Sequence, residues 1–319
     1  MKLFPAIHQA SSAFFGGPIR AGSVMLALAL CASTGLTARA SEAFLPLVEP
    51  ATQNFTPGKI TYAQLTTPDL EQAKKFYGQL FGWTFKDMNV SHGRYAQVMV
   101  AGQNIASVVE RPLPHSSAHL QPIWLPFIST ADATLLAGQA KTWGGKILFK
   151  PHDIPGLGKE TIIQDPQGGL FAALQSSSGD PVDTEGPVTS GAWIWNSLLT
   201  PSPGNSAGFY QKLFSYRIEK DVETKSKDGY LLESQSFARA TINPLPPHLP
   251  SDTQARWINF IQVDNVAQSA EQARKLGGKV LVEPHMDHNN SMIAIIADPA
   301  GAVLGIMEWR DATTAGEAK

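Results

Sequence analysis

The chain has 319 residues, of which 43% are apolar and 16% are charged, and its formal net charge is −2. This composition is typical of a folded globular protein and excludes a disordered chain, and the length exceeds that of one average domain. The sequence has no basic block or stripe, so it predicts no nucleic-acid partner.

Residues 1–40 have the features of a secretory signal peptide. An apolar stretch, VMLALALCA at residues 24–32, follows sparse positive charges, and the segment ends in Ala38-Arg39-Ala40, a small-x-small cleavage pattern. The apolar stretch is shorter than the roughly 20 residues that span a bilayer, so we expect no membrane span after cleavage. The sequence therefore predicts cleavage after Ala40 and a periplasmic or secreted protein.

Two alternatives for this segment remain open. It could stay attached as an uncleaved helical anchor, or Cys31 could carry a lipid, although Leu30 stands where lipoprotein signals prefer a small residue. Both alternatives also place the folded part outside the cytoplasm. Because Cys31 is the only cysteine, the mature chain would have no disulfide, no thiolate nucleophile and no Cys-ligated zinc.

A repeat with a period of 133 residues runs through the remainder of the chain. The matching groups, first copy against second, are Phe76-Tyr77 with Phe209-Tyr210, Leu80-Phe81 with Leu213-Phe214, Trp124 with Trp257, Gly144-Gly145-Lys146 with Gly277-Gly278-Lys279, and Asp165-Pro166-x-Gly168 with Asp298-Pro299-x-Gly301. One register without a net gap over more than a hundred residues indicates an internal duplication.

The repeat divides the chain into segments. These are a signal peptide at 1–40, a leader at 41–57, a first domain at 58–176, a linker at 177–190, a second domain at 191–310 and a tail at 311–319. The linker region has the sequence SSSGDPVDTEGP from residue 176 to 187, whose Ser, Gly, Pro and acidic residues predict an exposed connector.

Each copy divides again into two similar halves. In the first half, apolar residues at helical spacing predict a helix from about residue 70 to Gly82, between a strand at 59–66 and strands at 83–89, 95–101 and 104–110. The second half repeats the order, with a strand at 122–129, a helix at 131–143 and strands at 146–150, 160–163 and 170–174. The sequence therefore predicts an α+β fold of four βαβββ modules, two in each copy.

This order and these motifs resemble the vicinal oxygen chelate superfamily, which includes glyoxalase I, bleomycin-resistance proteins and extradiol dioxygenases. The resemblance covers nearly all of residues 60–309 and implies two tandem glyoxalase-like domains, each with a cupped mixed sheet that encloses a small-molecule site. In metal-using members, the first and last strands of each module supply His, Gln or Glu ligands to a divalent ion.

The ligand positions that the resemblance implies hold unsuitable residues here. They are Tyr62, Glu110, Leu125 and Ala172 in the first copy, and Trp195, Asn243, Ile258 and Gly305 in the second. Only Glu110 is a candidate ligand, and one carboxylate holds a divalent ion poorly. The sequence therefore predicts no metal cofactor, although a register shift that brings in Gln64, Gln175 or Glu308 stays open as an alternative.

Histidines give weaker signals. His285 and His288 flank Asp287 in a segment predicted to be a loop between strands, and His285 matches His152 under the repeat, which favours a structural role for both. His115 and His248 also match each other and lie in Pro-rich crossings, where we expect them to be surface residues. No hydrolase motif and no phosphate-binding loop is present in the sequence.

Aromatic residues in the opening strands of the modules are the better candidates for binding. We expect Tyr62, Trp124, Trp195 and Trp257 to line the cups together with Gln64 and Ser197 as hydrogen-bonding groups, although filling of the core is the alternative for the aromatic residues.

The function hypothesis is an exported protein that binds a small apolar or aromatic molecule without metal, as bleomycin-resistance-like members do. The alternative is a divalent-metal-dependent lyase, isomerase or dioxygenase of the same superfamily. Four modules in one chain can close both sheets internally, which is compatible with a monomer.

Overall fold

The computed structural model describes residues 42–90, 93–112, 122–184, 186–220, 229–247, 249–287 and 291–309. The predicted signal peptide, with Cys31, and the predicted tail at 311–319 lie outside these described residues. So do His115, His248 and His288.

The first domain contains the two predicted modules. The first module consists of β1 (Ile60–Thr67), α1 (Leu70–Phe81), β2 (Thr84–Val90), β3 (Gly93–Val100) and β4 (Gln103–Glu110). The second consists of β5 (Ile123–Ser129), α2 (Ala133–Thr142), β6 (Lys146–Ile154), β7 (Gly158–Gln164) and β8 (Leu170–Ser176). The order and the α+β class are confirmed, and the predicted strands at 146–150 and 160–163 are longer than the sequence indicated.

Local chemistry sets the ends of α1. The Asp69 side chain accepts a hydrogen bond from the Gln72 backbone N–H at 2.9 Å and so caps the first turn. Gly82 ends the helix in the left-handed conformation, with φ +70°, which glycine adopts without strain. Between these ends, Leu70, Phe76 and other residues at helical spacing form the buried stripe that the sequence predicted.

The second domain repeats the first. Its third module consists of β9 (Trp193–Thr200), α3 (Pro203–Phe214), β10 (Arg217–Lys220), β11 (Tyr230–Ser234) and β12 (Phe237–Pro244). Its fourth consists of β13 (Arg256–Gln262), α4 (Val266–Lys275), β14 (Lys279–Met286), β15 (Met292–Ala297) and β16 (Val303–Glu308). No helix in the described part of the chain is long and apolar enough to cross a bilayer.

Each domain forms one eight-stranded mixed sheet. The strand order is β2-β3-β4-β1-β5-β8-β7-β6 in sheet A and β10-β11-β12-β9-β13-β16-β15-β14 in sheet B. In sheet A, β1 pairs parallel with β4 and antiparallel with β5, and β5 pairs parallel with β8. Sheet B has the same pattern of parallel and antiparallel pairs. The duplication therefore extends to strand pairing.

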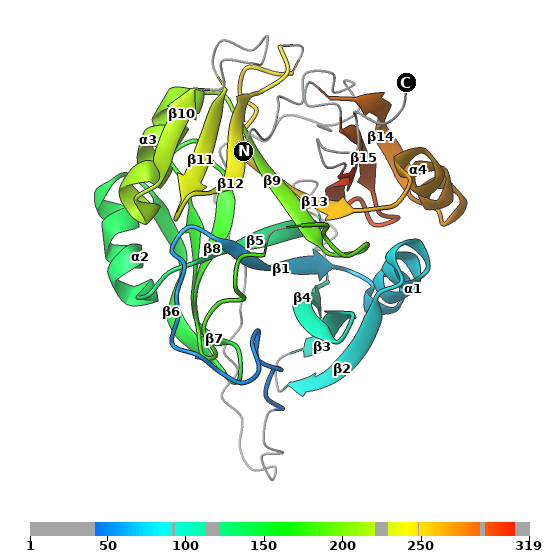
Figure 1. The fold of residues 1–319 in the computed structure, drawn as a ribbon, viewed down its shortest axis with the longest axis horizontal. Helices are drawn as coiled ribbons and strands as arrows, with labels where there is room; N and C mark the ends of the chain where they lie inside the picture. Colours follow the sequence, from blue (N-terminus) through cyan, green and yellow to red (C-terminus); the bar gives the residue numbers. More distant parts are fainter. Residues whose placement is uncertain are drawn as a thin grey trace.

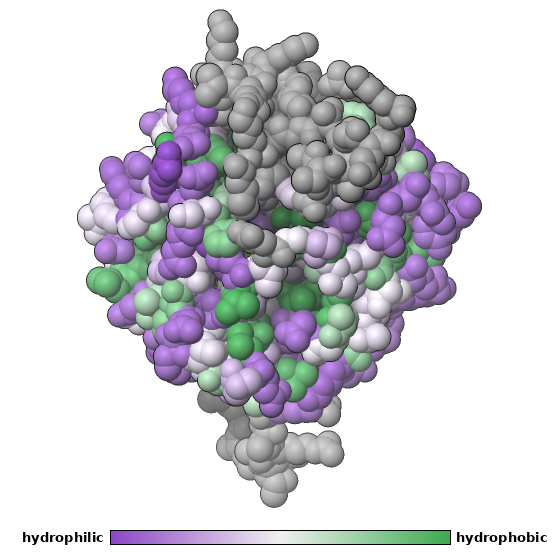
Figure 2. Space-filling view, in the orientation of Figure 1, coloured by the Kyte–Doolittle hydropathy of each residue, from purple (hydrophilic) through white to green (hydrophobic). Residues whose placement is uncertain are grey.

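The two domains pack against each other through the centres of their sheets. Strand β13 of the second domain contacts β5 of the first, α1 lies beside α4, and α2 lies beside α3 (Figure 1). This arrangement turns the other face of each sheet away from the domain interface. The outer surface over α4 is hydrophilic (Figure 2), and the described part of the chain exposes few large apolar side chains, namely Leu135, Val182 and Met286.

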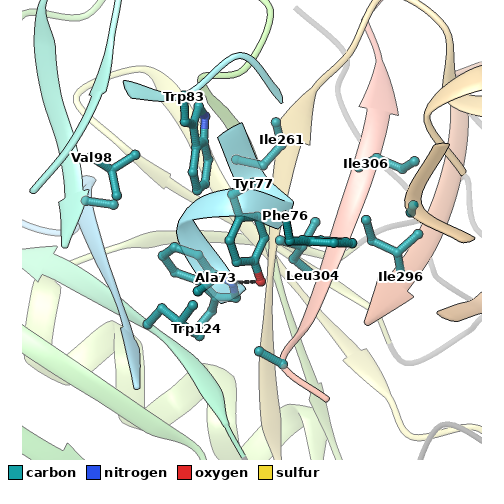
Figure 3. Packing of buried hydrophobic residues seen from close by; sticks show 14 of the residues in the cluster. Ala73, Phe76, Tyr77, Trp83, Val98, Trp124, Ile261, Ile296, Leu304 and Ile306 are labelled. Carbon is teal, nitrogen blue, oxygen red and sulfur yellow. Dashed lines mark hydrogen bonds between the residues drawn. The ribbon is translucent and has the colours of Figure 1, made fainter. Parts of the chain in front are cut away.

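An apolar core joins the domains on each side of this contact. Phe76 and Tyr77 of α1 pack with Ile261, Ile296 and Leu304 of the second domain (Figure 3). On the opposite side, residues of α3 pack with α2 and β8 in the same way. Because burying one large apolar side chain contributes roughly 1.5–3 kcal/mol, these shared cores favour one rigid pair of domains.

A buried hydrogen-bond pair crosses the interface within each core. The Tyr77 hydroxyl donates to Asp298 Oδ2 at 3.0 Å and accepts from Trp124 Nε1 at 2.8 Å. The repeat mates reproduce this arrangement, since the Tyr210 hydroxyl donates to Asp165 Oδ2 at 2.9 Å and accepts from Trp257 Nε1 at 3.0 Å.

These pairs explain two of the sequence landmarks. Burial raises the pKa of Tyr77 and of Tyr210, so both phenols stay protonated as donors. The Asp165 Oδ1 atom accepts the backbone N–H groups of Gln167 and Gly169, which fixes the turn between β7 and β8. The Phe-Tyr and Asp-Pro-x-Gly motifs therefore link one domain to the other, and the aspartates also fix the turns in which they lie.

The linker differs from its prediction. Ser178 and Asp180 are buried, and Asp180 accepts a hydrogen bond from the Thr56 backbone N–H at 2.6 Å. Asp183 forms a two-pronged ion pair with Arg239 at 2.6 and 2.7 Å and contacts Lys59 at 2.9 Å. The expected exposed connector is wrong for these residues, because their polar side chains find partners in both domains.

Replacing Tyr77 tests the cross-domain pair. Tyr77→Phe leaves the buried carboxylate of Asp298 and the Trp124 indole N–H without their partner, so it should lower the free energy of unfolding by about 1–3 kcal/mol in urea titrations. The matched control is Tyr95→Phe, at a half-buried tyrosine whose hydroxyl bonds only Arg111 among the described residues. Equal effects of the two substitutions would contradict a special role for the cross-domain pair.

Candidate functional site on the concave sheet faces

Side-chain alternation gives each sheet two different faces. One face packs against the helices and the other domain. The opposite face carries a separate cluster of buried hydrophobic side chains. In sheet A this second face contains Tyr62, Leu125, Phe127, Ala172 and Leu174. Because the sheet curls from β2 round to β6 (Figure 1), this second face is concave, and it corresponds to the predicted cup.

The predicted binding residues divide between the two faces. Tyr62 and Trp195 lie on the concave faces. Gln64 and Ser197 lie beside them, bonded to the facing strands β4 and β12. Trp124 and Trp257 lie on the opposite face, in the domain-interface cores, so the expectation that they line the cups is corrected.

The concave face of sheet B is mostly apolar. Its buried members are Trp195, Leu199, Ile258, Phe260, Val282, Ile293, Ile295 and Met307. Gly305 makes room for the Phe260 ring, since a Cβ at this position would lie 2.1 Å from that ring.

A short polar ladder crosses this apolar face. The Trp195 indole donates to Thr241 Oγ1 at 3.3 Å, Thr241 donates to Ser197 Oγ at 3.2 Å, and the Asn243 amide donates to Ser197 Oγ at 3.0 Å. Asn243 is buried, and its Oδ1 atom has no hydrogen-bond partner among the described residues. Thr241 was not identified as a candidate from the sequence. Its equivalent in sheet A is shown by the strand pairing and not by the sequence repeat.

Sheet A carries a different polar set. The Gln64 amide donates to Ser107 Oγ at 3.1 Å. Burial raises the pKa of the Tyr62 hydroxyl, which therefore stays protonated. Glu160 lies 3.3 Å from His152 Nε2 and raises the pKa of that imidazole through their hydrogen bond.

The implied metal positions do not suit a divalent ion. Leu125 and Ala172 on sheet A, and Ile258 and Gly305 on sheet B, offer no side-chain donor. Among the described residues, no group of three or more His, Cys, Asp or Glu side chains is placed to hold an ion.

Glu110 has a different role from the one predicted for a ligand. Its carboxylate accepts the Leu70 backbone N–H at 3.0 Å at the start of α1, and it also accepts Arg94 Nη1 at 3.0 Å. Glu110 pairs with Thr67 in the sheet, whereas Asn243 pairs with Leu199, so the two residues are not structural equivalents as the sequence register suggested.

The same capping contact recurs in the second and fourth modules but, among the described residues, not in the third. Gln175 accepts the Ala133 N–H of α2 at 3.4 Å, and Glu308 accepts the Val266 N–H of α4 at 2.7 Å. In the third module α3 begins with Pro203, which has no N–H to donate, and the equivalent strand position holds Pro244. Gln175 and Glu308 therefore cap the helices α2 and α4 in this structure.

The histidine prediction is changed in one respect. His152 and His285 lie in strands β6 and β14, not in a loop, and each Nδ1 contacts a backbone oxygen two residues earlier, at 2.9 Å and 2.8 Å. These matching contacts favour the structural role.

A depression of about 520 Å³ lies away from the cups, between α2 and α3. Asp132 and Leu136 line it from one helix, and Phe214 and Arg217 from the other side. It has no cluster of buried reactive groups in the described chain, so the concave faces remain the candidate site.

Glu110→Ala tests the capping role. Loss of the acceptor should lower the free energy of unfolding by about 0.5–2 kcal/mol, measured by chemical denaturation. Glu308→Ala removes the same contact from α4 and should act in the same direction, while Glu110→Gln should retain most of the stability. Unchanged stability in both alanine variants would show that these side chains do not cap the helices.

Two family descriptions match the chain, one for each domain. Residues 59–172 match the Glyoxalase/Bleomycin resistance protein/Dioxygenase superfamily, and residues 196–307 match a glyoxalase-like domain. "Putative glyoxylase CFP32" of Mycobacterium bovis is 27% identical over 266 residues, covering 81% of this chain and 98% of its own length. The anthracycline biosynthesis protein DauV of Streptomyces sp. is 27% identical over 275 residues, covering 81% and 96%.

Solved structures share the fold at low identity. The Mn(II)-bound glyoxalase from Novosphingobium aromaticivorans has a TM-score of 0.54 at 16% identity and covers 80% of this chain and 83% of its own. The 2,3-dioxygenase LapB from Pseudomonas sp. KL28 has a TM-score of 0.57 at 11% identity and covers 82% and 94%. With both domains matched, the chain belongs to the glyoxalase, bleomycin-resistance and dioxygenase superfamily, as a protein of two tandem domains.

Proposed function

We propose that this chain binds a small apolar or aromatic molecule on the concave face of its second domain, without a divalent metal. The observation that carries the proposal is the buried Asn243 Oδ1 atom, which lacks a partner among the described residues and lies at the end of a polar ladder on an apolar face. Trp195 and Phe260 supply aromatic surface beside the ladder.

The energetics indicate what kind of molecule fits. A buried acceptor without a partner costs about 1–3 kcal/mol, which a ligand recovers if it brings one hydrogen-bond donor. The apolar side chains around the ladder favour a hydrophobic body, and an indole ring favours stacking or edge contacts with an aromatic one. A phenol or a hydroxylated fused-ring compound meets both conditions.

The names of the relatives support an aromatic ligand. DauV and DnrV, both at 26–27% identity, are named for anthracycline biosynthesis, and anthracyclines contain fused aromatic rings. Identity at this level does not carry the ligand itself to this chain, so the support is for the chemical class.

Binding of 2-naphthol, measured by isothermal titration calorimetry, tests the proposal. We expect saturable binding that weakens at least tenfold in Asn243→Leu and also weakens in Trp195→Ala. The matched control is Asn259→Ser, because Asn259 is equally buried in sheet B and its Oδ1 atom also lacks a partner among the described residues, but its amide donates to the Trp124 carbonyl oxygen on the interface face. Absent binding, or equal loss in the Asn243 and Asn259 variants, would contradict the proposal.

A divalent-metal-dependent lyase, isomerase or dioxygenase is the alternative function. The superfamily and the Mn(II)-bound glyoxalase with the same fold favour it. The donors at the expected ligand positions do not fit an ion, so no catalytic step follows from these residues.

Export and a monomeric state are further parts of the proposal. The signal-peptide pattern at 1–40 supports periplasmic or secreted localisation, and sheets completed within one chain support a monomer. In a Gram-negative host, the protein from the periplasmic fraction should begin at Ser41 by N-terminal sequencing. A cytoplasmic protein that retains residues 1–40 would contradict the export proposal.

A further inference from the structure

A segment of the leader covers the concave face of sheet A. We call residues 44–48 the strap. Its Phe44 and Leu47 side chains are only 8% and 2% exposed, because they pack in the same cluster as Tyr62, Phe127 and Leu174. The strap therefore takes the place that a small apolar ligand would take in a glyoxalase-like cup.

Specific hydrogen bonds hold both backbone polar groups of one strap residue, Leu45. The Leu45 N–H donates to Gln97 Oε1 at 3.1 Å, and the Asn104 amide donates to the Leu45 carbonyl oxygen at 2.8 Å. Two side-chain amides on neighbouring strands β3 and β4 thus recognise both polar atoms of the same residue. The strap is bound like a peptide ligand.

The two ends of the strap are fixed by other contacts. The Phe44 N–H donates to the Pro155 carbonyl oxygen at 2.8 Å, and the Ser178 Oγ atom accepts the backbone N–H groups of Leu47 and Val48 at 3.0 and 3.1 Å. At Gly156 a Cβ would lie 2.0 Å from the Phe44 oxygen, and its φ is +85°, so only glycine permits this approach.

The strap leaves several polar groups beneath it without partners. Gln97 Nε2, Asn104 Oδ1 and Glu160 Oε2 are buried and form no hydrogen bond with any described residue. Each of these side chains is at most 6% exposed. Gln97 and Asn104 use one end of their amides on the strap and have the other end free. The face is therefore equipped to form more hydrogen bonds than its present occupant offers.

We propose that the concave face of sheet A is a binding site for a small aromatic peptide-like ligand with an amide N–H and a carbonyl group on either side of one carbon atom, and that the strap occupies it as an intrachain ligand which must leave before that ligand binds. Gln97 and Asn104 set the requirement for this N–H and this carbonyl oxygen, and the Phe44 pocket sets the aromatic requirement. This inference rests on the proposed function in that it uses a concave face for binding, and it adds a ligand class and a gate.

A shallow surface depression of about 380 Å³ lies near the strap. Its lining includes Phe55 of the leader together with Ile154, Lys159 and Ser176 of the sheet. Ile154 also packs against the cluster that holds Phe44 and Leu47, so the depression lies at the edge of sheet A next to the covered face.

The probe is N-acetyl-phenylalanyl-leucine amide, which reproduces Phe44 and Leu45. In the full chain, the double variant Phe44→Ala/Leu47→Ala weakens the strap and should bind the probe at least tenfold more tightly than the wild type by calorimetry. The control Val182→Ala changes an exposed linker side chain, 76% exposed, and should bind the probe as the wild type does. Circular dichroism checks that each variant is folded.

A second variant and a second readout keep the test decisive. Leu45→Pro removes the backbone N–H that donates to Gln97 Oε1, and its ring also disfavours the strap conformation, so it should increase the affinity for the probe as well. Adding Asn104→Ala to the double variant should cancel the gain. In the wild type, saturating probe should accelerate amide hydrogen exchange of residues 44–48. Equal affinities in all variants, or unchanged exchange, would overturn the strap proposal, and retained Asn243-dependent binding of 2-naphthol would show that the proposed function survives.

Discussion

The architecture depends on two buried hydrogen bonds between the domains, in each of which a tyrosine of one domain donates to an aspartate of the other. The phenol of Tyr77 on α1 reaches Asp298 in the last hairpin of the second domain, and Tyr210 reaches Asp165 in the first. Buried polar groups are costly without partners, so the phenols and carboxylates hold the domains in one relative orientation. Because this contact consumes one face of each sheet, it leaves the opposite, concave faces for binding.

The sequence predicts the modules well because their signals are local. Helical spacing from Leu70 onward and Gly82 define α1 in the sequence, and the repeat predicts the same elements in the other modules. Strand order follows from the family resemblance. The residue-by-residue register of the strands does not follow from the resemblance. Glu110 and Asn243, which match in the sequence repeat, occupy different positions in their sheets.

The site was harder to predict because its strands are buried on both faces. Trp124 and Leu125 are adjacent, and both are less than 10% exposed, so alternation in the sequence cannot say which of them faces the cup. The faces are assigned by the hydrogen bond of Trp124 to Tyr77, which lies within the first domain and in the core that the second domain completes. The strap was equally hidden, because Phe44 and Leu47 stand in a leader that carries no periodic pattern.

The two domains have diverged on the faces that the duplication left free. Sheet A is covered by the chain's own residues 44–48, and sheet B carries Trp195 beside the ladder that ends at Asn243. At the positions where metal-using members of the family have their ligands, the side chains of both sheets pack in the core or cap a helix. The chain keeps the superfamily fold, and we propose that its cups have lost the divalent-metal site.

The metal content of the purified protein tests this proposal most directly. The protein is purified without chelator, incubated with Mn(II), Fe(II) or Zn(II), dialysed, and analysed by inductively coupled plasma mass spectrometry. We expect metal well below one ion per chain for each of the three. One tightly held divalent ion per chain would contradict it.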